Sequence, residues 1–167
     1  MKLHMMMSLL ACSLVACSTT LTANAGTLPM SGGTIEFAQK MEQPEHPSGK
    51  MCTITLPKPT TDGSTKYYKM TDVGCGDNVA TFFKFNNVPS TTVVRLSSEK
   101  DCSAGDWRFQ LQAIKNPSST SWVNIKTLRG AEVNKVVVPG MLLLADEYDH
   151  GNIEGKLSCV SVTPAKL

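Results

Sequence analysis

The sequence lacks a hydrophobic run long enough to cross a membrane, and it lacks closely spaced cysteine pairs. Its longest largely apolar stretch, Met5 to Ala16, has about twelve residues, whereas a membrane-spanning helix needs roughly twenty. None of the six cysteines stands in a C-x2-C spacing, the spacing that structural zinc sites favour. These two absences argue against a helical membrane protein and against a zinc-stabilised domain.

Charge of either sign is scarce and nearly balanced. The chain has 16 Lys and Arg against 14 Asp and Glu, and aromatic residues make up only 6% of it. No basic run interrupts this balance, so the sequence shows no electrostatic footprint for nucleic acid or for anionic lipid. We therefore expect no nucleic-acid partner.

The N-terminus has the features of a bacterial secretory signal. A single positive residue, Lys2, precedes the apolar stretch, and small residues follow, ending in Ala23-Asn24-Ala25. Cleavage after Ala25 predicts a signal peptide over residues 1–25 and one mature domain over residues 26–167. The mature protein is then expected to be secreted or periplasmic.

A second processing site competes with the first. Leu14-Val15-Ala16-Cys17 matches the bacterial lipoprotein pattern, in which the cysteine carries acyl chains. The signal would then cover residues 1–16, and Cys17 would anchor the domain to the outer membrane. Contact with a membrane is expected only if Cys17 is lipidated.

Four cysteines remain beyond either processing site: Cys52, Cys75, Cys102 and Cys159. An even number of cysteines in an exported chain predicts disulfides. All four are therefore expected to be oxidised, which leaves no thiol for catalysis.

One pairing of these cysteines follows from a predicted hairpin. Residues 84–86 and 92–94 flank a turn-like segment, and positions equidistant from a turn face each other across a hairpin. Cys75 and Cys102 are equidistant in this way, which predicts a disulfide between them. The other two cysteines would then join the first core strand to the last.

Alternating patterns and β-rich runs, separated by Gly, Pro, Asn and Asp clusters, recur along the mature chain. The predicted strands cover residues 34–38, 51–56, 66–70, 79–86, 91–96, 107–114, 122–127, 136–145 (broken at Pro139-Gly140) and 156–162. Residues 43–50, with two prolines and a glycine, are expected to form a loop. The pattern predicts a single all-β domain, a disulfide-stapled β-sandwich of Greek-key type.

The sequence offers little for catalysis. The mature chain has two histidines, His46 and His150, and neither stands beside a residue that suggests an activated nucleophile. We expect no enzymatic activity and no catalytic residues. Aromatic residues are expected mainly in the core, with a sugar or partner platform from Trp107, Trp122 or Tyr68 as the alternative.

Residues 75–82, CGDNVATF, resemble the middle of a βγ-crystallin Greek key. In that family Asn/Asp and Ser/Thr residues before a strand bind calcium. Asp77, Asn78 and Thr81 match those positions, so the resemblance implies a calcium site formed by these three residues; no other cofactor is expected.

The start of the mature domain, Ser31 to Phe37 with Cys52 downstream, is similar to the first strand of chaperone–usher pilins. In that family an N-terminal extension completes a neighbour's sheet by strand addition. This resemblance implies an adhesion or fimbrial subunit.

Together these features predict a non-enzymatic binding protein. The expected partner is a protein, for example an exported protein that the domain neutralises or inhibits. A fimbrial-type structural subunit and a module for surface glycans are the alternatives.

Overall fold

The structure, a computed structural model, describes residues 31–167, and its regular secondary structure consists of β-strands and one short 3-10 helix. The expected signal peptide and Cys17 lie outside the described residues. The strands are β1 (Thr34–Gln43), β2 (His46–Thr55), β3 (Lys66–Lys69), β4 (Phe82–Asn86), β5 (Val93–Ser97), β6 (Trp107–Ala113), β7 (Val123–Asn124), β8 (Val136–Val138), β9 (Met141–Tyr148) and β10 (Cys159–Thr163). A short 3-10 helix, η1 (Ile125–Leu128), follows β7.

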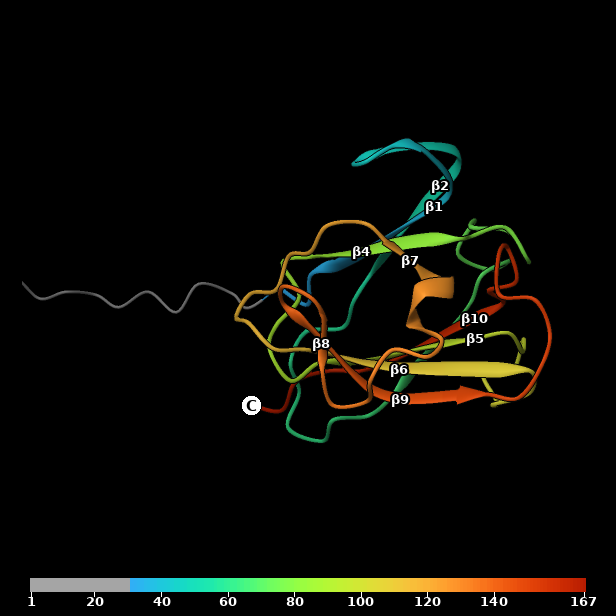
Figure 1. Cartoon of the computed structure of the whole chain (residues 1–167). Helices are drawn as coiled ribbons and strands as arrows, with labels where there is room; N and C mark the ends of the chain where they lie inside the picture. Colours follow the sequence, from blue (N-terminus) through green and yellow to red (C-terminus); the bar gives the residue numbers. More distant parts are fainter. Residues whose placement is uncertain (1–30) are drawn as a thin grey trace, which may run out of the picture.

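The strands form two antiparallel sheets that pack face to face (Figure 1). The first sheet has the order β2-β1-β4-β7 and the second the order β3-β10-β5-β6-β9-β8. In the second sheet β10 returns to lie beside β5, so that β10, β5, β6 and β9 have the spatial order of a Greek key. The predicted all-β sandwich is therefore confirmed.

The core lies between the sheets and is made by alternating side chains. In β6, Trp107, Phe109 and Leu111 are fully buried, while the residues between them are partly exposed. Phe37 and Phe83, which are paired on β1 and β4, reach the same core from the first sheet. Each such side chain contributes roughly 1.5–3 kcal/mol of burial free energy, so these rows define which face of each sheet points inward.

The predicted hairpin between residues 84–86 and 92–94 is wrong. β4 pairs with β1 and β7 in the first sheet, whereas β5 pairs with β6 and β10 in the second. The connection over residues 87–92 therefore crosses from one sheet to the other. Asn87 and Thr91 adopt positive φ angles of 53° and 67° along this crossing.

The disulfide pairing inferred from that hairpin is also wrong, although all four cysteines are oxidised as predicted. The bonds are Cys52–Cys75 and Cys102–Cys159, with Cα–Cα distances of 5.1 and 5.2 Å. Because β4 and β5 lie in different sheets, Cys75 and Cys102 do not face each other across a ladder. The first bond joins β2 to the loop after β3, and the second joins the β5–β6 loop to β10.

The expected loop over residues 43–50 is a strand for most of its length. Pairing of β1 with β4 ends at Ala38 and Phe82, and beyond this point β1 and β2 pair only with each other. We call residues 39–50 the arm; none of them is buried. Most of the arm projects beyond the first sheet (Figure 1), and its tip contacts the residue before β7 through Glu45 and Trp122. β2 is the edge strand of its sheet, which tolerates Pro47 within the strand.

Candidate functional site

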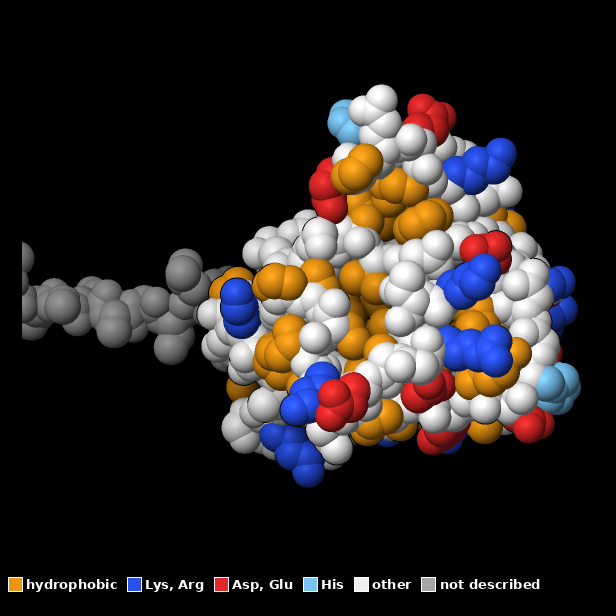
Figure 2. Space-filling model, viewed as in Figure 1, with side chains coloured by type: hydrophobic (Ala, Val, Ile, Leu, Met, Phe, Trp, Pro, Cys, Tyr) orange, Lys and Arg blue, Asp and Glu red, His pale blue; other side chains and the backbone are white. Residues whose placement is uncertain are grey.

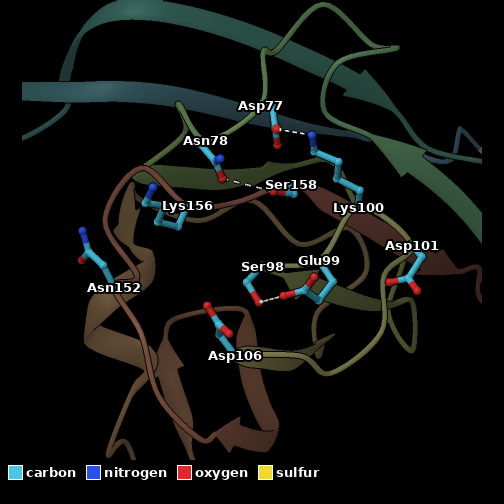
Figure 3. Close-up of a pocket in the computed structure, with 10 residues that line it drawn as sticks. All are labelled: Asp77, Asn78, Ser98, Glu99, Lys100, Asp101, Asp106, Asn152, Lys156 and Ser158. Atoms are coloured by element: carbon cyan, nitrogen blue, oxygen red, sulfur yellow. Dashed lines mark hydrogen bonds and ion pairs between the residues drawn. The ribbon is translucent and has the colours of Figure 1, made fainter.

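A polar cleft of about 480 Å³ opens at the end of the sandwich where three loops meet (Figure 3). The loops follow β3, join β5 to β6, and join β9 to β10. The cleft is lined by Asp77, Asn78, Ser98, Glu99, Lys100, Asp101, Asp106, Asn152, Lys156 and Ser158. All ten side chains are polar, and the two disulfides hold the loops that carry several of them.

Asp77 is fixed in this cleft by an ion pair. Its Oδ2 atom lies 2.8 Å from Lys100 Nζ, and its side chain is only 23% exposed. The hydrogen bond with Lys100 holds the pKa of Asp77 below its ordinary value, and the same contact raises the pKa of Lys100. The second carboxylate oxygen, Oδ1, is buried and has no hydrogen-bond partner among residues 31–167.

The residues that the crystallin resemblance selects for calcium are only partly brought together. Asp77 and Asn78 line the cleft, whereas Thr81 is not part of its lining. Asn78 Oδ1 accepts a hydrogen bond from Ser158 Oγ at 3.2 Å, so this amide also has a protein partner. In the part of the chain that the structure describes, no group of three or more His, Cys, Asp or Glu side chains is placed to hold a metal ion. Calcium binding stays a prediction.

Two further carboxylates of the cleft, Asp101 and Glu99, form hydrogen bonds within their own loop. Asp101 accepts a hydrogen bond from the Ser103 backbone N–H at 3.0 Å, and this bond lowers the pKa of Asp101. Ser98 Oγ donates to Glu99 Oε1 at 3.4 Å. These contacts are typical of polar loop ends that hold a turn in shape.

His150 stands next to the cleft and is bracketed by two carboxylates. Its Nδ1 lies 2.9 Å from Asp149 Oδ2, and its Nε2 lies 3.1 Å from Asp106 Oδ1. The hydrogen bond with Asp149 and the charge of Asp106 raise the pKa of His150. With both ring nitrogens beside carboxylates, the protonated imidazolium fits this position best, because it donates from both nitrogens.

A catalytic nucleophile does not accompany either histidine. No hydrogen bond within residues 31–167 joins His46 or His150 to a serine, threonine or cysteine side chain. His46 lies at the exposed start of β2, far along the chain from the cleft residues. The two histidines are therefore separate surface groups in this structure.

The aromatic candidates have three different environments. Trp107 is fully buried and donates from Nε1 to the Asn152 carbonyl at 3.1 Å, so its role as an exposed platform is excluded. Tyr68 packs against the core, and burial raises its pKa. Trp122 is partly exposed, with Lys84 Nζ lying 5.0 Å from its ring centre.

Sequence reasoning found only part of the cleft. The crystallin resemblance selects Asp77 and Asn78, but the strand pattern does not place Lys100, Asn152, Lys156 and Ser158 near them. For Lys100 and Ser158 a signal was available, because each lies within two residues of a cysteine, Cys102 and Cys159. That signal requires the correct disulfide pairing.

The arm is a second candidate surface. Apolar side chains lie on the arm and at its root (Figure 2). Met51, where the arm joins the sandwich, is 48% exposed, and Met41 and Pro47 are paired farther out. Apolar side chains gathered on an exposed hairpin are a feature of interaction surfaces.

Comparisons with protein-family models, with curated proteins and with solved structures found no match for this chain. Within the described residues, no helix has the length and apolar character needed to cross a membrane. The cleft, the arm and the sheet surfaces are the features of this chain that can indicate a function.

Proposed function

We propose that this chain is an exported, non-enzymatic binding protein, secreted or periplasmic, that holds a protein partner with its arm. The observation that carries the proposal is the arm itself: none of residues 39–50 is buried. A two-stranded hairpin on its own is at best marginally stable in water. The arm is therefore expected to contribute little to the free energy of unfolding of the sandwich. A role outside the domain accounts for it.

The composition of the arm suits a protein surface better than a charged ligand. Within residues 39–50 the two lysines, Lys40 and Lys50, balance the two acids, Glu42 and Glu45, so the arm has no net charge. Methionine is flexible and polarisable, and it adapts to irregular apolar partners. Met41 and Met51 provide such contact area next to the prolines of the arm.

Two hydrogen bonds hold the arm in one position before any partner binds. Gln39 Oε1 accepts from the Lys50 backbone N–H at 3.1 Å, across the bulge near its root. Glu45 Oε1 at the tip accepts from the Trp122 backbone N–H at 3.1 Å. Ordering of the arm in the free protein lowers the entropy that binding must offset.

Export is supported by the two disulfides, which persist in oxidising compartments. The fimbrial alternative places the donated segment before β1, and β1 itself pairs with β2 and β4 of its own chain. That alternative gives no role to the arm, so we favour the binding role over the fimbrial one.

The proposal is tested by site-specific crosslinking in the native host. A photoreactive residue replaces Met41 on the arm, and a matched control carries it at Val136, an exposed side chain on the other sheet. We expect one discrete crosslinked protein with the arm probe, absent with the Val136 probe. Equal products from both probes, or no arm product, would refute an arm-mediated role.

A further inference from the structure

The outer face of the second sheet carries a row of polar side chains around Arg95. Pairing aligns Tyr67 on β3, Ser161 on β10, Arg95 on β5 and Gln110 on β6. Their neighbours along each strand, such as Leu96 and Val160, point into the core, so this row faces outward. We call Tyr67, Arg95, Gln110 and Thr163 the Arg95 face.

Arg95 is a half-buried cation without a carboxylate partner. Its Nε donates to Gln110 Oε1 at 2.9 Å, and its Nη1 donates to Thr163 Oγ1 at 3.3 Å. Within residues 31–167 it forms no salt bridge. A guanidinium has five N–H donors, so these two bonds leave three unused.

Other half-buried cations on the strands are paired. Lys84 on the first sheet lies 3.3 Å from Glu36, and its side chain is 27% exposed. Arg108, on the same β6 as Gln110, lies 2.7 Å from Glu147 and is 29% exposed. Removing a charge from water without a counter-ion is unfavourable, so the unpaired state of Arg95 points to an anion supplied from outside the chain.

An exposed aromatic ring lies on the same face. Tyr67 is 66% exposed, the largest exposure among the aromatic side chains of this face, and it is two strands from Arg95, roughly 10 Å away. Ser161, the small residue between them, is buried. Lys69 points to the same side as Tyr67 and adds a second positive charge.

We propose that the Arg95 face binds an acidic oligosaccharide, with a sugar carboxylate paired to Arg95 and a neighbouring ring resting on Tyr67. A carboxylate matches the planar donor fork of arginine in a bidentate manner. Gln110 Oε1 and Thr163 Oγ1 accept from Arg95 and fix its guanidinium, and Thr163 Oγ1 also shares a hydrogen bond with Thr65 Oγ1. The Gln110 amide nitrogen offers a neutral donor for a sugar hydroxyl. The separation of Tyr67 from Arg95 exceeds one sugar ring, so the ligand is an oligomer. This role is independent of the arm.

The test is titration of the mature, disulfide-intact protein with oligomers of galacturonate, mannuronate and hyaluronate, followed by amide NMR and calorimetry. We expect shifts on β3, β5, β6 and β10 for at least one of these oligomers. Methyl esterification of its carboxylates, or the Arg95→Gln change, should lower affinity by about tenfold or more, as expected for loss of a charge-assisted bidentate pair.

Matched variants separate this site from general charge effects. Arg108→Gln removes an equal charge from a neighbouring paired arginine and should change affinity by less than about twofold. Tyr67→Ala should weaken binding, and Tyr67→Phe should preserve it. No binding of any acidic oligomer, or equal binding by Arg95→Gln and the parent protein, would overturn the proposal.

The same titration distinguishes this proposal from the arm-mediated role. A variant in which Asn-Gly replaces residues 39–50 should bind the oligomer as the parent protein does. If the armless variant loses the oligosaccharide, the ligand is not on the Arg95 face and this inference fails, whatever the crosslinking result.

Discussion

The sandwich body and the arm are made of the same two strands, but different forces hold them. In the body, β1 lies between β2 and β4, and it presents Phe37 to a core shared by both sheets. In the arm, β1 has one neighbour, and no side chain of residues 39–50 is buried. One continuous hairpin therefore contains a segment that stabilises the fold and a segment that the fold merely supports.

The disulfides follow the same division. Cys52 lies two positions from Lys50, the last residue of the arm, yet its bond ties β2 to the loop carrying Cys75. The arm thus begins where a covalent bond has fixed its root. Because the root of the arm is fixed and the arm buries no side chain, substitutions at its tip are expected to leave the stability of the core unchanged.

The largest expected effect is at Phe37. Phe37→Ala leaves a cavity opposite Phe83, so we expect a loss of about 3–5 kcal/mol in the free energy of unfolding. Denaturant unfolding of the disulfide-intact protein measures it. Met41→Ala on the arm should change the free energy of unfolding by less than about 0.5 kcal/mol. Comparable losses at both positions would show that the arm contributes to stability as the body does.

Removal of the Cys102–Cys159 bond should come next. Changing both cysteines to serine should lower the free energy of unfolding by about 2–4 kcal/mol, because the bond spans 57 residues and restricts the unfolded chain. Chemical denaturation measures the change. Removing Cys52–Cys75, whose cysteines are 23 positions apart, should lower the free energy of unfolding by slightly less, by the same reasoning. The reverse order would mean that native contacts of the two loops dominate over chain entropy.

Replacement of residues 39–50 by Asn-Gly tests the arm directly. The pair Ala38 and Met51 would then flank a two-residue turn of the type that hairpins prefer. We expect the free energy of unfolding to change by less than about 1 kcal/mol, since no buried side chain is removed. Thermal and denaturant unfolding together check this. A cooperative loss of the whole fold would show that the arm belongs to the body.

The smallest expected effect is the pH dependence at His150. Its pKa is raised in the folded state, foremost by the hydrogen bond with Asp149, so protonation favours folding. The stabilisation is fully present below the ordinary pKa of 6.5 and is lost as the pH rises through the folded pKa. His150→Gln should abolish this part of the pH profile, and Asp149→Asn should reduce it. If the pH dependence of the free energy of unfolding is unchanged in His150→Gln, other titrating groups are responsible for it.

Much of the sandwich could be predicted from the sequence because burial imposes a period of two. β6 shows this most clearly, with Trp107, Phe109 and Leu111 alternating with polar residues. The arm was missed because its strands bury nothing, and Pro44, Pro47 and Gly49 resemble loop residues. Strands without burial have no hydrophobic pattern to detect.

The pairing of strands could not be predicted with the same success. The connection over residues 87–92 is short enough for a hairpin, yet it carries the chain between sheets. The local sequence pattern does not distinguish a hairpin from a crossing between sheets. The wrong prediction of a Cys75–Cys102 disulfide followed from the wrong hairpin. For the cleft, Asp77 and Asn78 were selected locally, whereas Lys100 and Ser158 reach it through contacts between distant loops.

The position of β10 has a consequence for the order in which the fold can be completed. β10 follows every other described strand along the chain, yet it is inserted between β3 and β5. During synthesis β3 and β5 therefore emerge without the neighbour that joins them, and Cys102 emerges without Cys159. β3 cannot join the second sheet, and the Cys102–Cys159 bond cannot form, until this last strand is available.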